Sequence, residues 1–158
     1  MKKTVILRGV PGAGKSTAAK QMFVEQGLAG IPVTTFSADY YFERSGEYQF
    51  DPSKLGAAHA SCLRAFVLQL TALSAGGDGI LVIDNTNTTV QEMDVYVKLA
   101  RAFDVPFEVV TVQCDPALAA ARGLHGVPTA KVWEMHRRLM DAKIPRDWPH
   151  RVIQSEVR

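Results

Sequence analysis

Gly9-Val10-Pro11-Gly12-Ala13-Gly14-Lys15-Ser16-Thr17, near the start of the 158-residue chain, contains the complete pattern G-x-x-x-x-G-K-[ST]. The run Thr4–Arg8 before it is short, apolar and partly β-branched, as expected of a buried parallel strand. The residues after it, Thr17–Phe23, are mostly good helix formers. A strand, a glycine-rich turn and a helix in this order predict a phosphate-binding P-loop.

The chemistry of this loop suits a nucleoside triphosphate. Glycine lets the backbone approach an anion closely, its N–H groups surround phosphates, and the helix N-terminus adds partial positive charge. Lys15 is expected to reach the β- and γ-phosphates and Ser16 to bind Mg²⁺. A glycine-rich turn that binds nothing is the alternative, and the complete motif opposes it. The residues predicted to bind ATP are Gly9, Pro11, Gly12, Ala13, Gly14, Lys15, Ser16 and Thr17.

Length and composition predict one globular domain over residues 1–158. A chain of 158 residues can bury its own core, and 47% hydrophobic with 22% charged residues is ordinary for such a domain. Cys62 and Cys114 are far apart and lack metal-binding spacing, which favours a reduced, cytoplasmic setting. No apolar run reaches membrane-spanning length, and the first strand begins too close to Met1 for a signal peptide. We therefore expect no membrane association.

Apolar strands alternate with helices along the whole chain. Parallel strands need helical crossovers of this kind. The prediction is an α/β, three-layer P-loop NTPase fold with a five-stranded parallel sheet flanked by helices. We expect strands at 4–8, 33–37, 80–84, 107–113 and 151–155, and helices at 17–27, 51–74, 90–103, 116–121 and 129–142.

Two of the predicted strands are followed by or end in an acid, Asp39 and Asp84. Ligands of open parallel sheets bind beyond the carboxyl ends of the strands, so both acids should face the P-loop. Asp39 could accept a proton from a substrate hydroxyl, touch the Mg²⁺ shell, or cap a helix or turn. Asp84 ends an almost purely apolar strand in a Walker-B-like pattern, which makes it a candidate for the metal or the substrate.

The residues after Asp84 are unusually polar, Asn85-Thr86-Asn87-Thr88-Thr89. Thr88 or Thr89 with Glu92 resembles a helix capping box. Because capping needs one such residue and not five, Thr86 and Asn87 are candidates for binding an acceptor substrate.

The stretch Tyr40–Pro52 is expected to be an aromatic loop at the lip of the pocket. Its rings could stack on nucleobases or pin the loop onto the core. Arg44 in this loop and Arg64 in the next helix are candidates for a substrate phosphate. His59, on the same helix, is at least as well explained as a histidine at the edge of the core.

Residues 116–142 are expected to form a helical lid, because two helices flank the glycine-punctuated turn Arg122–Pro128. Closure would exclude water, and Arg122 could neutralise charge on a transferring phosphoryl group. Residues 122–158 hold eight Lys or Arg against four acids, although the net charge of the whole chain is only +2. That excess could serve phosphate binding or form a solvated helix face. Further lid candidates are His125, Arg137 and Arg138.

These motifs together resemble the P-loop polynucleotide 5′-hydroxyl kinases, both the phage-type kinase domain and its small single-domain relatives. The similar stretches are G-V-P-G-A-G-K-S-T, S-A-D-Y-Y-F, F-D-P…A-H, I-D-N-T-N, and R-G-L-H-G-V-P followed by E-M-H-R-R. The resemblance implies transfer of the γ-phosphate of ATP, with Mg²⁺, to a 5′-hydroxyl of DNA or RNA. It gives Lys15 and Ser16 the triphosphate, Asp39 the role of general base and Arg122 that of the lid arginine. Phe42 stands where the phage-type enzyme has an arginine that contacts the acceptor phosphate.

Two other functions stay open. One is the same chemistry on a small metabolite or nucleoside, which the modest net charge favours. The other is a nucleotide-dependent ATPase or switch that acts through a partner protein, which Asp39 opposes because a switch needs no acceptor base. We expect a nucleic acid with a free 5′-hydroxyl as substrate and no obligate protein partner.

Overall fold

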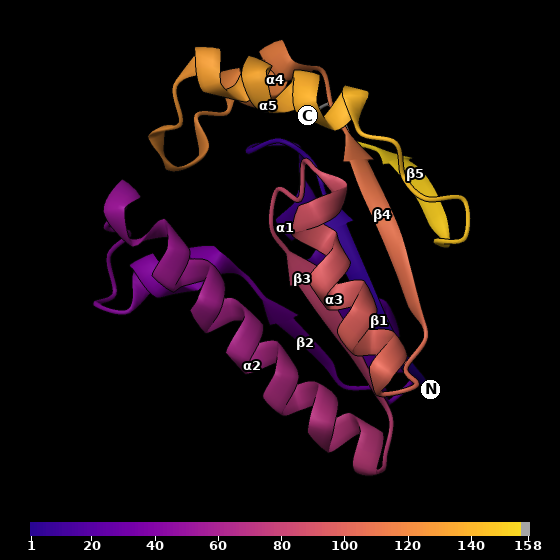
Figure 1. Ribbon diagram of the computed structural model, residues 1–158. Coiled ribbons are helices and arrows are strands. Elements are labelled where there is room, and N and C mark those ends of the chain that lie inside the picture. Colours follow the sequence, from indigo (N-terminus) through magenta and orange to yellow (C-terminus); the bar gives the residue numbers. More distant parts are fainter. Residues whose placement is uncertain (156–158) are drawn as a thin grey trace.

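A computed structural model describes residues 1–155 and contains a five-stranded sheet with the order β2-β3-β1-β4-β5 (Figure 1). Every neighbouring pair is parallel. The predicted fold class, a parallel five-stranded P-loop sheet flanked by helices, is therefore confirmed. The strands are β1 (Lys2–Arg8), β2 (Val33–Phe36), β3 (Gly79–Asp84), β4 (Phe107–Gln113) and β5 (His150–Gln154).

Helices cover both faces of this sheet and one of its edges. The α1 helix packs on the face that carries Val5 and Leu7, and α2 and α3 pack on the face that carries Ile6 (Figure 1). Among residues 1–155 no helix is long and apolar enough to cross a membrane. The helices are α1 (Lys15–Leu28), α2 (Leu55–Ala75), α3 (Val90–Ala102), α4 (Pro116–Ala121) and α5 (Thr129–Asp141), with 3-10 turns η1 (Ala38–Glu43), η2 (Pro52–Lys54) and η3 (Leu124–Gly126).

The central strand β1 explains why the P-loop is rigidly placed. It pairs with β3 on one side and β4 on the other, and its residues Thr4–Arg8 are all buried. A strand covered on both faces is expected to be mainly apolar, and the middle of this one, Val5–Leu7, is apolar, with the polar Thr4 and Arg8 buried on either side. The loop that leaves its carboxyl end is thus held at the middle of the sheet.

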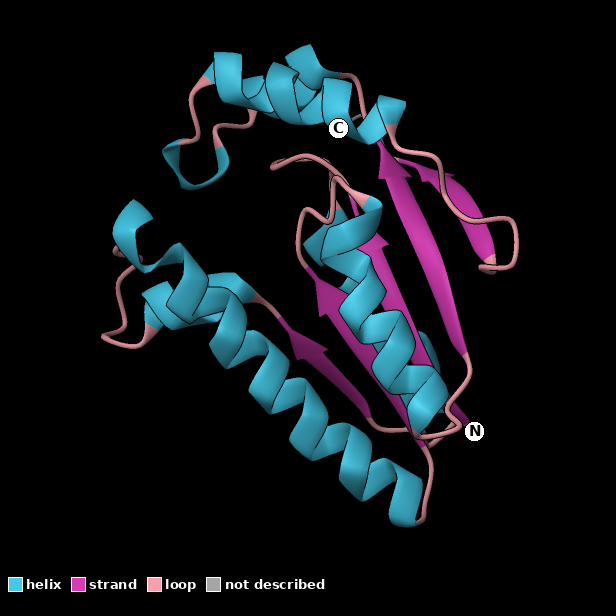
Figure 2. Ribbon diagram, in the orientation of Figure 1, coloured by secondary structure: helices cyan, strands magenta, loops and turns pink. Residues whose placement is uncertain are grey.

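The predicted lid elements α4, η3 and α5 lie beyond the carboxyl ends of the strands (Figure 2). The α4 helix packs tightly against the P-loop, since a Cβ built on Gly12 would lie 2.5 Å from the carbonyl oxygen of Ala119. Gly12 also has a φ of +82°, a conformation that strains other residues. Two independent constraints therefore require glycine at position 12.

The stretch Tyr40–Pro52 differs from its prediction as a loop. It begins inside the 3-10 turn η1, which starts because the Ser37 side chain accepts from Asp39 N and the Asn85 amide oxygen accepts from Ala38 N. Phe42 then packs against Ala58 of α2 and is only 6% exposed. Local sequence does not reveal this turn, because one of its two caps comes from the distant Asn85.

Substituting Gly12 with Ala is expected to destabilise the fold by about 2 kcal/mol, which lowers Tm by roughly 4–8 °C in a domain of this size. The added methyl meets the α4 backbone and the residue keeps a strained φ. The control is Gly27→Ala, because Gly27 lies in α1 with nothing within 4 Å of its Cβ and has no positive φ. Thermal unfolding should show Gly27→Ala at or above the wild-type Tm. Equal Tm values for the two variants would contradict the close packing at Gly12.

Candidate active site

The Lys15 side chain is buried at the carboxyl edge of the sheet. It is 8% exposed, and its Nζ donates to the carbonyl oxygen of Val10 at 3.0 Å. Burial lowers the pKa of Lys15, while the carboxylates of Asp84 and Asp39 raise it again. Both acids therefore act electrostatically on the P-loop lysine, as their predicted places at the ends of neighbouring strands imply.

Asp84 and Ser16 form the pair best suited to a divalent cation. The Ser16 hydroxyl donates to Asp84 Oδ2 at 3.0 Å. Burial raises the pKa of Asp84, and Lys15 and the Ser16 hydrogen bond lower it in part. Hard oxygen ligands fit Mg²⁺, which commonly takes one or two protein oxygens and completes its shell with phosphate and water. No group of three or more His, Cys, Asp or Glu within residues 1–155 could hold a metal by itself.

Asp39 lies at the start of η1 and turns its carboxylate toward two side chains from other segments. The Tyr48 hydroxyl donates to its Oδ1 at 3.4 Å, and His125 Nε2 lies 3.8 Å from its Oδ2. The capping alternative for Asp39 does not hold, because the side chain that caps this turn is that of Ser37. The carboxylate is half exposed at 48%, so a substrate can reach it.

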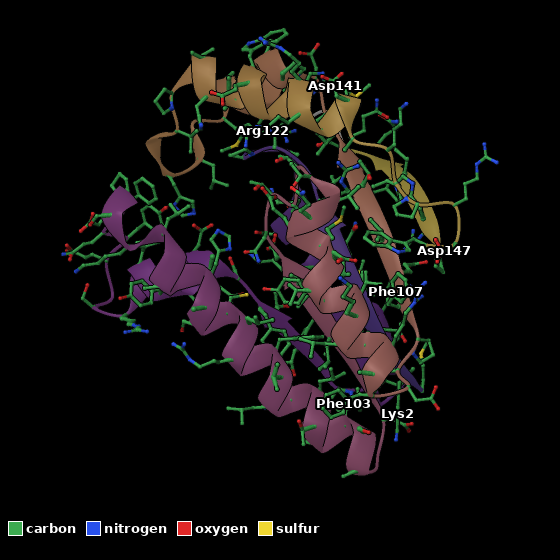
Figure 3. The ribbon with its side chains drawn as sticks, in the orientation of Figure 1. Lys2, Phe103, Phe107, Arg122, Asp141 and Asp147 are labelled. Carbon is green, nitrogen blue, oxygen red and sulfur yellow. The ribbon has the colours of Figure 1, made fainter. Side chains whose placement is uncertain are left out.

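Arg122 ends α4 and reaches back to the P-loop (Figure 3). Its Nη1 donates to the carbonyl oxygen of Gly12 at 2.6 Å and to the Ser155 hydroxyl at 3.1 Å. The guanidinium is thereby fixed beside the loop that is expected to hold phosphates. A permanent cation in this place suits the neutralisation of phosphate charge.

An open groove of about 560 Å³ runs along the outer side of the P-loop. P-loop and α1 residues such as Gly12 and Thr17 line one wall. The other wall is formed by Arg122 and Leu124, which follow α4, and by β5 with Ser155. The groove mixes apolar and polar surface, and Lys15 and Ser16 are among its lining residues, whereas Asp39 is not. It offers room for the nucleoside of a phosphate donor.

The polar run after Asp84 has mainly a structural role. Asn87 is 3% exposed and its Nδ2 donates to the carbonyl oxygen of Leu7 at 2.8 Å. The backbone carbonyl of Thr86 accepts from Gly9 N at 2.9 Å. The expected capping box is present, because Thr89 Oγ1 accepts from Glu92 N and Glu92 Oε2 accepts from Thr88 N. The Asn87 side chain therefore stabilises the fold, and we correct the prediction that it binds an acceptor substrate.

The remaining arginine candidates lie away from the P-loop lysine. Arg44 stacks on the Tyr41 ring, with its guanidinium carbon 4.0 Å from the ring centroid. Arg64 is exposed on α2. On α5, Arg137 is exposed and Arg138 pairs with Glu134 at 3.5 Å. None of these contacts joins them to the group formed by Lys15, Asp84 and Asp39.

Two residues that matter here were not predicted. Arg8 is 2% exposed and donates to the backbone oxygens of Asn87, Thr88 and Leu139, which ties β1 to the last turn of α5. The signal in the sequence was the charge of Arg8 at the end of an apolar strand. Tyr48 contacts Asp39 and the lid residue His125, and nothing local in the sequence distinguishes it from its aromatic neighbours. His59, expected at the edge of the core, is exposed.

A family model described as an AAA domain matches residues 5–125, which is most of the chain. Human NEDD4-binding protein 2 is 33% identical over 141 residues, covering 83% of this chain and 7% of that protein. The bifunctional polynucleotide phosphatase/kinase of Schizosaccharomyces pombe is 26% identical over 115 residues, covering 73% of this chain and 22% of that protein. The chain therefore spans less than a quarter of either relative.

Solved structures with the same fold include small-metabolite kinases. The APS kinase of Mycobacterium tuberculosis, in complex with AMPPNP and APS, has a TM-score of 0.66 at 16% identity, over 99% of this chain and 90% of that one. A gluconokinase from Sinorhizobium meliloti has a TM-score of 0.61 at 15% identity, over 99% and 85%. At such identities the likeness concerns the fold alone. The chain thus belongs to the AAA-domain family matched over residues 5–125, and its fold is that of the P-loop kinases.

Proposed function

We propose that this chain transfers the γ-phosphoryl group of ATP to a 5′-hydroxyl of a polynucleotide, DNA or RNA. The observation that carries the proposal is the position of Asp39, a half-exposed carboxylate beyond the carboxyl end of β2 that lies beside Tyr48 and the lid residue His125. A nucleotide switch has no use for a base at this place, whereas a kinase needs one beside the acceptor hydroxyl. The fission-yeast polynucleotide phosphatase/kinase among the relatives supports this choice of acceptor.

The donor half consists of the P-loop, Lys15 and Arg122. Backbone N–H groups of the loop and the N-terminus of α1 surround the β- and γ-phosphates, and Lys15 Nζ exchanges the Val10 carbonyl for a phosphate oxygen. Arg122, already bonded to Gly12 O, faces the same phosphates and stabilises the charge that spreads over the transferring group. The nucleoside extends into the groove along α1.

Ser16 and Asp84 would hold Mg²⁺, which when bound neutralises phosphate charge. The acidity of Asp84 matters here, because only its ionised form is a good ligand. Lys15 and the Ser16 hydrogen bond favour that ionised form against the effect of burial.

The acceptor half is organised by Asp39. Its carboxylate takes the proton of the 5′-hydroxyl, the hydroxyl oxygen bonds to the γ-phosphorus, and the bond from that phosphorus to the β,γ-bridging oxygen breaks to release ADP. The Tyr48 hydroxyl donates to Asp39 Oδ1 and so orients the carboxylate. Burial and the negative charge of Asp39 raise the pKa of Tyr48 to about 12, so this hydroxyl keeps its proton at neutral pH.

A small-metabolite acceptor is the second candidate. Phe42 is buried in an aromatic cluster, so position 42 supplies no cation for an acceptor phosphate. The fold neighbours named as an APS kinase and a gluconokinase act, by their names, on small molecules. An acceptor screen with labelled ATP and Mg²⁺ separates the two candidates. We expect label on a 5′-hydroxyl oligonucleotide, and label only on nucleosides or metabolites would reject the polynucleotide.

Replacing Asp39 with Asn is expected to lower kcat by about 10²–10⁴-fold while nucleotide affinity stays within about threefold, because the amide keeps the shape but is no base. Transfer is measured with labelled ATP, and binding by titration calorimetry with AMPPNP. The matched control is Lys15→Ala, which should lose both. Undiminished transfer by Asp39→Asn would reject Asp39 as the base.

Replacing Asp84 with Asn should abolish transfer but stabilise the fold at neutral pH. An acid whose pKa is raised by folding costs stability once it ionises, so the free energy of unfolding falls as pH rises from the unfolded pKa to the folded one. Asn cannot ionise, so we expect a higher Tm than wild type at neutral pH. The gain should shrink as the pH approaches about 3.9, where an unfolded Asp takes up its proton. A lower Tm than wild type at neutral pH would contradict this account.

A further inference from the structure

Three rings form a stack that joins the acceptor wall to the lid. Phe50 and Tyr48 lie parallel, with centroids 6.4 Å apart and an interplanar angle of 4°. His125 of the lid stacks on Tyr48 with centroids 3.8 Å apart at 24°. The rings come from segments about 75 residues apart in the chain, so the stack is a tertiary contact across the site. It is the kind of face-to-face contact that also binds nucleobases.

This stack lies directly beside the proposed base. The Tyr48 hydroxyl bonds Asp39 Oδ1 at 3.4 Å, and His125 Nε2 lies 3.8 Å from Asp39 Oδ2. Any planar group that lies on Tyr48 is therefore held next to the carboxylate. A nucleoside stacked there could therefore present its 5′-oxygen to Asp39.

The backbone at the tip of the lid favours a His125 side chain that can leave its contact with Tyr48. Gly123, His125 and Gly126 all have positive φ, of 59°, 55° and 67°. This left-handed conformation is unfavourable for a histidine, so favourable contacts must offset it. The contact with Tyr48 provides such an offset. The glycines on both sides let the tip change conformation when that contact is exchanged for another.

We propose that the Tyr48 ring is the platform for the terminal base of the acceptor, and that the His125 ring covers this platform until the base replaces it. The inference rests on the proposed function and names the part of the acceptor that is recognised. His125 lies closest to Tyr48, with centroids 3.8 Å apart against 6.4 Å for Phe50, so the face under His125 is the one that a base would take. Arg44, stacked on Tyr41 of the same wall, supplies a cation for a phosphate further along the strand.

The test compares two oligonucleotides that differ only at the 5′-terminal residue, one with its base and one abasic, both with a free 5′-hydroxyl. KM and kcat are measured with labelled ATP, and Kd by fluorescence anisotropy in the presence of AMPPNP. Since stacking on an aromatic side chain contributes about 1–3 kcal/mol per base, wild type should bind the abasic strand roughly 5- to 150-fold more weakly.

Two variants of Tyr48 separate the ring from its hydroxyl. Tyr48→Leu should bind both oligonucleotides alike, because it has no aromatic face. Tyr48→Phe keeps the face and loses the bond to Asp39, so it should retain the discrimination in KM and Kd while kcat falls. Retained discrimination in Tyr48→Leu would overturn the proposal, and thermal unfolding of each variant shows that it is folded.

The His125→Asn variant should change the affinity for the base-bearing strand in the opposite direction. Asn tolerates the left-handed backbone and has no ring, so it leaves Tyr48 uncovered. We expect the base-bearing strand to bind more tightly than to wild type, by about the fivefold that a removed competitor of roughly 1 kcal/mol implies. Weaker binding would overturn the exchange of rings.

The outcomes distinguish this inference from the function on which it rests. Transfer to both strands with equal KM sustains the kinase and rejects the platform. Discrimination in Kd without any transfer sustains the platform and rejects the kinase. Neither binding nor transfer of either strand overturns both.

Discussion

The buried ammonium of Lys15 is the constraint on which the rest of the site depends. A charge in this place is costly unless it is paired and hydrogen-bonded. Here the Val10 carbonyl accepts a hydrogen bond from it, and the carboxylates of Asp84 and Asp39 offset part of the cost of burial. Each partner has its own requirement. The loop must carry glycine at position 12 to pass α4, and both acids must stand at the ends of strands. A triphosphate that replaced the Val10 carbonyl would bind to an ammonium group that is already held in place.

The order of the strands divides the site into two sides. The strands β3 and β2 lie on one side of β1 and bring Asp84 and, after β2, Asp39. On the other side β4 leads into α4, which brings Arg122, and Ser155 follows β5. The P-loop between them receives acids from one side and a guanidinium from the other. In the proposed reaction, a phosphoryl group held there would have its donor nucleoside toward Arg122 and its acceptor toward Asp39, which is the arrangement that transfer requires.

Local patterns in the sequence were sufficient for the sheet, because each strand is an apolar run and each crossover carries helix formers. The same reasoning placed Asp39, Asp84 and the P-loop lysine at one edge, since the carboxyl ends of parallel strands meet there. It failed where a side chain forms a hydrogen bond with backbone that is distant in the sequence. Asn87 appeared available for a substrate and instead holds Leu7, and η1 depends on an amide from the end of β3. The contact of Tyr48 with His125 joins segments that no local pattern relates.

The most direct measurement is a crystal structure of the chain with ADP, aluminium fluoride, Mg²⁺ and a 5′-hydroxyl oligonucleotide. The account predicts that the 5′-oxygen lies in line with the metal fluoride and within about 2.6–3.2 Å of the Asp39 carboxylate, the reach of a general base. It also predicts that Lys15 Nζ has left the Val10 carbonyl for the nucleotide. An acceptor oxygen bound away from Asp39, or a carboxylate there that ligates only the cation, would contradict the central claim that Asp39 and the P-loop act on one phosphoryl group.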